Sequence, residues 1–208
     1  MLRNFIVYIQ NIFFFKCLEW HLRGCKTVLD VGCGYNSAIG HIRKTFISEG
    51  IEIYPKTLQL SKKRKLHDSY KLGDIRRLGN YYKNKSFDAV VSIDVIEHLE
   101  KSEAIKMIKS MEKIARKKII LLTPNGFYEQ EAYDGNPYQV HKSGWVISDL
   151  TKLGYVVYGL RGLKILRTEH AGIRHKPYFF WGFISLISEV IFFRVPSICF
   201  DLFAVKKV

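Results

Sequence analysis

The feature that most constrains this chain is a short apolar run that breaks into two glycines. Residues Thr27 to Val31 are β-branched or aliphatic except for Asp30, which is the pattern of a buried strand. Gly32 and Gly34 follow at once, and residues without a Cβ would let backbone N–H groups approach a ligand at a strand-to-helix turn. In an open α/β sheet, such a turn lies in the crevice where ligands bind.

The nature of the ligand can be argued from the same turn. A dinucleotide fingerprint requires a third small residue after the two glycines, and Ser37 at that position satisfies it only in part. Asp30 would repel a pyrophosphate, but it can accept hydrogen bonds from an ammonium or a hydroxyl group. The turn therefore favours a ligand with cationic character over one that carries phosphates.

Strands and helices are expected to alternate along the rest of the chain. Strands are expected at residues 27–31, 50–54, 68–72, 87–93, 118–123, 155–160 and 202–205. Helices are expected at residues 4–22, 38–46, 55–65, 94–117, 143–153 and 178–193. This alternation predicts a single α/β domain over residues 1–208, with a doubly wound, mostly parallel sheet and right-handed crossovers.

Three further acidic residues follow predicted strands. Glu52 lies 22 positions after Asp30, where an acidic residue of a Rossmann-like unit binds the hydroxyl groups of a ribose. Asp74 follows the third strand in a Gly-Asp turn, and Asp94 follows the fourth. Because the carboxyl ends of parallel strands meet at one crevice, we expect these carboxylates to line it together.

Three stretches of the sequence resemble the class I S-adenosylmethionine (SAM) dependent methyltransferases. They are Val28-Leu29-Asp30-Val31-Gly32-Cys33-Gly34, residues 87–98 and residues 141–155. The resemblance implies a Rossmann-like sheet of seven strands, with an antiparallel last strand and helices on both faces. It also implies SAM as the cofactor, with the small-molecule or quinone-pathway O-methyltransferases as the type that the chain resembles.

The resemblance also implies which residues contact the cofactor. Asp30 and the two glycines would hold the methionine portion of SAM, and Glu52 would bind the ribose. Asp74 would accept a hydrogen bond from the adenine amino group, with Ile75 against the ring. The implied cofactor-binding residues are Asp30, Gly32, Cys33, Gly34, Glu52, Ile53, Asp74, Ile75 and Asp94, of which Cys33 would contribute its backbone rather than its thiol.

A group of acidic residues and histidines suggests two alternative roles. Asp94, Glu97 and His98 are spaced to share one face of a helix, and with His141 they could hold a divalent ion, as in some metal-dependent relatives. Capping of that helix by Asp94 and Glu97 explains both acids without an ion, so we expect no metal. His141 or His98 is then the candidate general base that removes the proton of an acceptor hydroxyl.

Three segments outside the predicted sheet are expected to shape the site. Residues 1–24 form an N-terminal helix that covers the ligand cleft or packs on the sheet. Residues 127–142 are a polar and aromatic loop over the ligand, where a substrate would bind. Residues 177–195 hold an apolar helix too short to cross a bilayer, which we interpret as a core or substrate-cleft helix in preference to an interfacial membrane helix.

Charge and cysteine content bear on the partners and the compartment. The chain has 33 Lys and Arg residues against 19 Asp and Glu, a net charge of +14. Nucleic acid or an anionic membrane would suit this charge, but the spread of the lysines favours a generally basic surface. Four cysteines without metal-ligand spacing, and no signal peptide, predict a cytoplasmic protein with reduced thiols, with peripheral membrane contact left open.

The methyl acceptor that we expect is a hydroxyl group of a small molecule or of a lipid-like molecule. The alternatives are an RNA 2′-O-methyltransferase that uses a divalent metal, and a SAM-binding domain without catalytic activity. No partner protein is indicated by the sequence.

Overall fold

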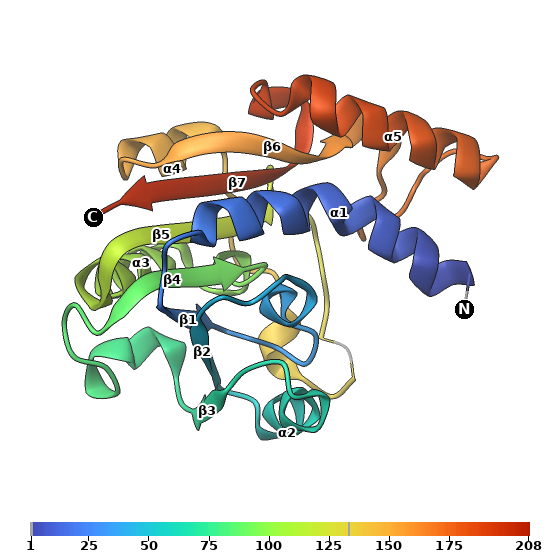
Figure 1. Ribbon diagram of the computed structural model, residues 1–208. Coiled ribbons are helices and arrows are strands. Elements are labelled where there is room, and N and C mark those ends of the chain that lie inside the picture. The colour runs from blue at the N-terminus through green and yellow to red at the C-terminus, as the bar shows by residue number, and fades with distance from the viewer. Residues whose placement is uncertain (1, 133) are drawn as a thin grey trace.

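In the part of the chain that the computed structural model describes, residues 2–132 and 134–208, seven strands form one sheet (Figure 1). Their order across the sheet is β3-β2-β1-β4-β5-β7-β6. The strands are β1 (Thr27–Val31), β2 (Ile47–Glu52), β3 (Ser69–Leu72), β4 (Phe87–Ile93), β5 (Ala115–Pro124), β6 (Val156–Leu163) and β7 (Cys199–Lys207). Neighbouring strands are parallel except that β7 runs antiparallel to β5 and β6. The predicted Rossmann-like sheet with an antiparallel last strand is confirmed.

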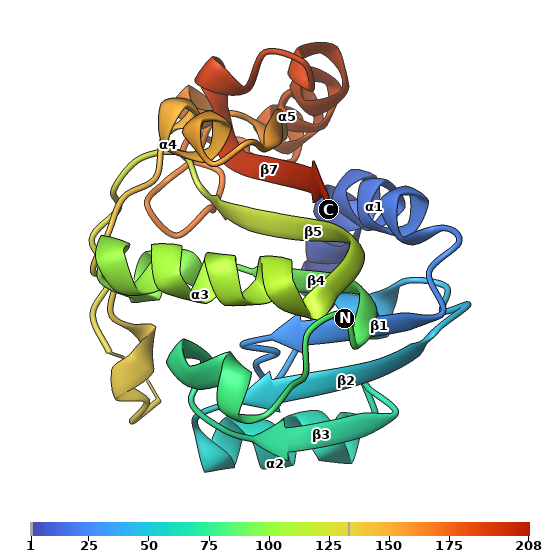
Figure 2. The same cartoon turned by 90° about the vertical axis from the view of Figure 1, so that its left-hand side faces the viewer.

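Helices cover both faces of this sheet. The α-helices are α1 (Leu2–Leu22), α2 (Pro55–Arg64), α3 (Lys101–Ile114), α4 (Ile147–Lys152) and α5 (Tyr178–Phe192). Short 3-10 turns are η1 (Ala38–His41), η2 (Ile75–Asn80), η3 (Ile96–His98), η4 (Pro137–Gln139), η5 (Lys164–Leu166) and η6 (Pro196–Ile198). Figures 1 and 2 show α1 and α3 on opposite sides of the central strands. The predicted N-terminal helix is α1, and its Phe14, Leu18 and Leu22 are buried against the sheet.

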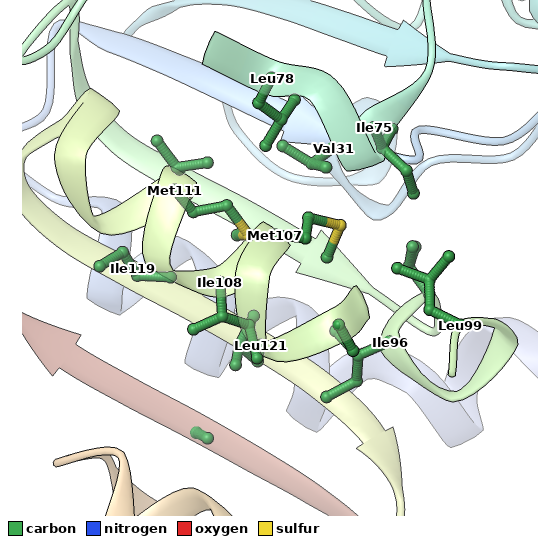
Figure 3. Packing of buried hydrophobic residues seen from close by; sticks show 14 of the residues in the cluster. Val31, Ile75, Leu78, Ile96, Leu99, Met107, Ile108, Met111, Ile119 and Leu121 are labelled. Carbon is green, nitrogen blue, oxygen red and sulfur yellow. The ribbon is translucent and has the colours of Figure 1, made fainter. Parts of the chain in front are cut away.

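Successive residues of the central strands face opposite helices. In β4, Val90 packs in the apolar cluster that contains α3, whereas Ala89 and Val91 pack in the cluster that contains α1. Figure 3 shows the first cluster, where Met107 and Met111 point from α3 into the packed side chains. A strand buried on both faces must be apolar at nearly every position, which explains the continuous run seen in the sequence.

The crossover after β1 contains only one 3-10 turn, so the helix predicted over residues 38–46 is wrong. The next strand already begins at Ile47, rather than at residue 50, and residues 42–46 are needed to reach it. A Cβ at Gly40 would clash with the side chain of Leu66, so this turn packs close to the chain that precedes β3.

The helix predicted over residues 94–117 is replaced by η3, a break and α3. Asp94 has a φ of +52°, a left-handed conformation that does not begin a right-handed helix. At the other end, α3 stops because Ala115 starts β5, and Arg116 then pairs with Asp88 at 2.9 Å. Strand pairing therefore overrides the helix-forming tendency of this segment.

The helix predicted over residues 143–153 is confined to the six residues of α4. Trp145 forms isolated β-bridges with Asn125 and Gly126, which keep the preceding backbone extended. The remaining predicted strands are present, and β6 and β7 are longer than predicted.

Helix α5 has its polar side inward and its apolar side outward. Its buried residues are Gly182, Ser185, Ser188 and Glu189. Phe179 and Phe183 are 79% and 62% exposed. The interpretation of residues 177–195 as a core or substrate-cleft helix is therefore wrong. Within the described residues, no helix has the length and hydropathy to cross a membrane.

Candidate functional site

A cavity of about 350 Å³ lies at the carboxyl ends of the parallel strands. The residues predicted to bind a cofactor all line it: Asp30, Gly32, Cys33, Gly34, Glu52, Ile53, Asp74, Ile75 and Asp94. They come from the ends of four successive parallel strands, β1 to β4, which is where an open α/β sheet binds its ligand. The residues that were chosen from the sequence because they lie near strand ends therefore all line one cavity.

The glycine turn after β1 directs its N–H groups into the protein rather than toward a ligand. Gly32 and Cys33 donate to the carbonyl of Ile51 at 2.9 and 3.1 Å, and Gly34 donates to Glu52 Oε2 at 3.0 Å. The expectation that these N–H groups contact a ligand is wrong. Gly34 borders open space, since a Cβ built there would meet nothing within 4 Å among the described residues. Without a side chain, Gly34 leaves this space to a ligand.

Asp30 is buried beside the turn and holds it in place. Its Oδ2 accepts a 2.5 Å hydrogen bond from Ser37 Oγ, which in turn accepts from the backbone N–H of Ile39. His67 Nε2 lies 3.3 Å from the same carboxylate oxygen. Nearby, burial raises the pKa of the Cys33 thiol, with the carboxylates of Asp30 and Glu52 adding to this. A neutral, buried thiol agrees with the expectation that the Cys33 side chain does not contact the cofactor, but its backbone N–H is already bonded to the Ile51 carbonyl.

Glu52 ends β2 and presents its carboxylate to the cavity. Oε2 accepts from Gly34, and Oε1 accepts from the backbone N–H groups of Ile53 and Tyr54, both at 2.9 Å. Burial raises the pKa of Glu52, although these three hydrogen bonds oppose the shift. The carboxylate is thus fixed by backbone donors, in an orientation that leaves further acceptor capacity on its oxygens.

Asp74 follows β3 and caps η2. Its carboxylate accepts from the backbone N–H of Arg76 and pairs with the guanidinium of the same residue at 2.8 Å. Hydrogen bonds from Arg76 lower the pKa of Asp74. Ile75, the next residue, is buried and lines the same cavity, so an acid and an apolar surface lie side by side there.

A second cavity, of about 630 Å³, adjoins the first. The two share Asp94, His98, Gln139 and Arg161. The second cavity is further lined by Glu97, Gln130, Glu131, His141, Glu169 and His170. Two joined cavities, one at the strand ends and one beyond Asp94, would accommodate two ligands that react with each other.

Arg161 lies at the junction of the two cavities. Its guanidinium is 3.3 Å from Asp94 Oδ2 and 2.9 Å from Asp201 Oδ2. Among the described residues, neither Asp201 oxygen nor Asp94 Oδ1 has a hydrogen-bond partner of good geometry. Burial raises the pKa of Asp201 to about 7, although the charge of Arg161 opposes this. Nothing in the sequence around Arg161 marks it out, so this residue was missed.

Two histidines face each other at the wall of the second cavity. His98 Nδ1 lies 3.3 Å from the carbonyl of Val140, and His141 Nδ1 lies 2.6 Å from the carbonyl of Tyr128. A carbonyl can only accept, so each Nδ1 carries a proton, and in a neutral ring the lone pair then lies on Nε2. Burial, with a contribution from His141, lowers the pKa of His98 to about 4, which keeps His98 neutral at pH 7.

The capping interpretation of Asp94 and Glu97 is wrong. Val95, rather than Asp94, precedes η3, and no side chain caps that turn. Glu97 is buried and accepts from Thr123 Oγ1 at 3.0 Å. Burial, with the nearby charge of Asp94, raises the pKa of Glu97 well above its ordinary value. A neutral Glu97 is what burial favours as long as no cation lies beside it.

Glu97, His98 and His141 form a group that could hold a metal ion. One ligand atom from each lies within 4.8 Å of the others. The donors are a carboxylate and two imidazole nitrogens with free lone pairs, a set that suits a divalent ion such as Zn²⁺ or Mn²⁺. Asp94, the first residue of the predicted group, is paired with Arg161 instead.

The loop over residues 127–142 lies over the first cavity, as predicted. Asn136, Tyr138, Gln139 and Lys142 line that cavity. The loop is fastened to the β2 end by a 3.0 Å hydrogen bond from Tyr54 Oη to the carbonyl of Gly135. Residue 133 of this loop lies outside the described part of the chain.

Comparison with known proteins finds partial sequence matches and a shared fold. A model of the methyltransferase domain matches residues 29–123. Norajmaline N-methyltransferase of Rauvolfia serpentina is 32% identical over 98 residues, which cover 43% of this chain and 32% of that protein. The chain thus matches about a third of the length of that curated relative.

Solved structures share the fold over nearly the whole chain. A SAM-dependent methyltransferase from Archaeoglobus fulgidus superposes with a TM-score of 0.56 and 17% identity, over 93% of this chain and 94% of that one. Magnesium protoporphyrin IX methyltransferase from Synechocystis PCC 6803, solved with bound SAH, gives a TM-score of 0.54 and 14% identity. That alignment covers 97% of this chain and 82% of the other.

Proposed function

We propose that this chain is a class I SAM-dependent methyltransferase that transfers a methyl group from SAM to a small or lipid-like acceptor, and the partial matches to the methyltransferase domain and to norajmaline N-methyltransferase support this. The observation that carries this proposal is the gathering of Asp30, Glu52, Asp74 and Asp94 on one cavity that opens into a second. SAM carries a sulfonium and an ammonium group and no phosphate, so an acidic cavity suits it.

Each carboxylate has a role in binding SAM. Glu52 would accept from the ribose hydroxyls, since backbone donors already fix its orientation. Asp74 would accept from the adenine amino group, with Ile75 against the ring. Asp30 acts through the turn that it holds, and Gly34 there leaves room for the methionine chain. Asp94 lines both cavities, where its carboxylate suits the ammonium group.

The transfer itself depends mainly on position. The sulfonium of SAM is already a good leaving group, so holding the acceptor in line with the methyl group supplies much of the catalysis. A hydroxyl acceptor must also lose its proton, and the Nε2 lone pairs of His98 and His141 are the candidate acceptors of that proton. The four cysteines are free thiols, which supports a reducing, cytoplasmic compartment.

A second candidate is metal-assisted transfer to a ribose hydroxyl of RNA. The group formed by Glu97, His98 and His141, together with the net charge of +14, favours it. A divalent ion held there would lower the pKa of the acceptor hydroxyl and would remove the proton from Glu97. The earlier reason against a metal was helix capping by Asp94 and Glu97, and that reason no longer holds.

Two measurements test these assignments in sequence. Calorimetric titration with SAM and SAH comes first, and a protein that binds neither would overturn the proposal. Incubation with methyl-labelled SAM and fractionated cell extract then identifies the acceptor. His98→Ala and His141→Ala should each lower turnover, whereas the exposed His175→Ala should not. Full turnover in both cavity variants would remove the base assignment, and turnover that depends on added Mg²⁺ or Mn²⁺ would establish the metal-assisted route.

A further inference from the structure

The outer face of α5 is the most apolar exposed surface among the described side chains. Its exposed residues are Tyr178, Phe179, Phe180, Phe183, Ile187, Val190 and Ile191, and Val195 and Ile198 continue the exposed apolar surface beyond the helix. We call the residues of this list, from Tyr178 to Ile198, the α5 face. Figure 1 shows α5 lying along the outside of the molecule beside β6, which is the edge strand of the sheet. A continuous apolar surface of this kind marks an interaction site.

The inward side of α5 makes polar contacts that fix the orientation of the helix. Glu189 accepts from the Arg161 N–H at 2.8 Å, and Ser188 Oγ accepts from the Leu163 N–H at 3.1 Å. Rotating the helix to bury its phenylalanines would break both hydrogen bonds. The apolar residues therefore face outward in the stable arrangement.

The exposed charged residues that flank α5 in the sequence are all basic. Arg174 and Lys176 precede the helix, Arg194 follows it, and all three are exposed. The only acidic residue between positions 172 and 198 is Glu189, which is buried. An apolar strip with aromatic side chains and basic residues at both ends is complementary to a bilayer whose headgroups are anionic.

We propose that α5 lies flat on an anionic phospholipid membrane, with the α5 face inserted among the acyl chains near the headgroups. The helix has 15 residues, about 22 Å at 1.5 Å per residue, and a bilayer core is about 30 Å thick. It is therefore long enough to lie in the interface and too short to cross. The inward polar contacts remain intact in this arrangement, because the bilayer takes up only the outer face.

The second cavity and α5 are joined by a short segment of the chain. Glu169, His170 and Ala171 line that cavity, and residues 172–177 lead directly from them into α5. A lipid-like acceptor would then reach the cavity from the bilayer, a consequence that rests on the proposed function. Membrane binding itself does not depend on it.

Sedimentation with lipid vesicles, in the absence of SAM, tests the proposal. We expect binding to phosphatidylcholine vesicles that contain phosphatidylglycerol, and much weaker binding to pure phosphatidylcholine. Phe179→Ser with Phe183→Ser should lower the partition coefficient about tenfold or more, since two exposed rings lose their burial in lipid. Lys176→Gln with Arg194→Gln should lower it about fivefold per charge at low salt.

Matched controls separate this helix from general surface effects. Ile47→Ser removes an exposed apolar residue from β2, and Lys62→Gln with Lys63→Gln removes two exposed charges from α2. Neither control should alter vesicle binding. Binding that falls as much in the controls as in the α5 variants would overturn the proposal, as would no binding to anionic vesicles. A dimer that dissociates in the phenylalanine variants without vesicle binding would assign the face to a second copy instead.

Discussion

Replacement of Glu52 by Gln tests the cofactor site most directly. The carboxylate accepts three backbone hydrogen bonds, one from Gly34 on Oε2 and two from Ile53 and Tyr54 on Oε1. A glutamine has one oxygen and one NH₂ group, so at least one of these N–H donors must face another donor. An unsatisfied buried N–H costs about 1–3 kcal/mol, and we expect the free energy of unfolding to fall by about that amount.

The loss in SAM affinity should be larger than that of an ordinary polar contact. The ribose hydroxyls lose a charged acceptor, and hydrogen bonds to charged groups contribute about 1.5–3 kcal/mol. We therefore expect the Kd of SAM to rise about tenfold to a hundredfold in Glu52→Gln. Glu49→Gln is the matched control, since Glu49 lies on the same strand but bonds to Tyr82 and Ser69 away from the cavity.

The pH dependence of SAM affinity tests independently whether Glu52 binds the ribose. Burial raises the pKa of Glu52 above that of an unfolded glutamate. The folded protein therefore takes up this proton at higher pH than the unfolded chain does. Protonation of Glu52 therefore stabilises the unliganded protein. This stabilisation is complete below the pKa that Glu52 has in the unfolded chain, and it is lost as the pH rises through the pKa that Glu52 has in the folded protein. SAM binding requires the ionised acceptor, so SAM affinity should fall as the pH is lowered through that raised pKa.

Isothermal titration calorimetry between pH 5 and pH 8 measures both effects, and urea denaturation of the unliganded variants gives their stability. Glu52→Gln should remove the acid-side loss of affinity as well as weakening binding at pH 8. If it binds SAM as tightly as the unaltered protein and with the same pH profile, the ribose assignment is refuted.

Two further substitutions test the turn and the buried charges. Gly32→Ala should lower the free energy of unfolding by about 2–5 kcal/mol, because the residue has a φ of +75° and its new Cβ would lie 2.7 Å from Val95 Cγ2. Urea denaturation measures this loss, and adding Val95→Ala should recover the part that comes from the clash. Arg161→Met should cost about 3–5 kcal/mol at pH 8, where Asp201 is left buried without its counter-charge. The cost should be smaller at pH 5, because burial raises the pKa of Asp201 to about 7 and the proton then neutralises it; equal costs at both pH values would contradict this reasoning.

The residues that line the first cavity could be predicted from the sequence because their positions follow from strand ends alone. Asp30, Glu52, Asp74 and Asp94 each lie at or just beyond the end of a strand, and parallel strands bring their carboxyl ends to one edge. No contact between distant side chains had to be known. The seven strands and the antiparallel last strand were expected from the family resemblance rather than from strand ends.

Residues whose role depends on tertiary contacts could not be found in this way. Arg161 is one of 33 basic residues, and its partners Asp94 and Asp201 lie 67 positions before it and 40 positions after it. The left-handed backbone of Asp94 was also hidden, since Asp-Val-Ile-Glu reads locally as the start of a helix.

Helix α5 was predicted at the right place, but its expected burial was wrong for a physical reason that concerns the site. An apolar segment suggests a core helix, but the edge strand β6 offers α5 polar backbone groups at Arg161 and Leu163. The helix meets them with Glu189 and Ser188, and Ser185 Oγ donates to the Arg161 carbonyl at 3.2 Å. Because the few polar residues of α5 contact the sheet, the exposed side of the helix is apolar.

The two sides of α5 thus serve different purposes. Its inner side holds the backbone of Arg161, whose guanidinium reaches Asp94 at the junction of the two cavities. Its outer side makes no contact needed for that arrangement. Substitutions on the outside, such as Phe179→Ser, should therefore leave SAM affinity unchanged, whereas Glu189→Ala removes an acceptor from the Arg161 N–H and should weaken SAM binding without altering any residue of either cavity. Attachment to a membrane and alignment of the site are in this way combined in one helix, yet separable by mutation.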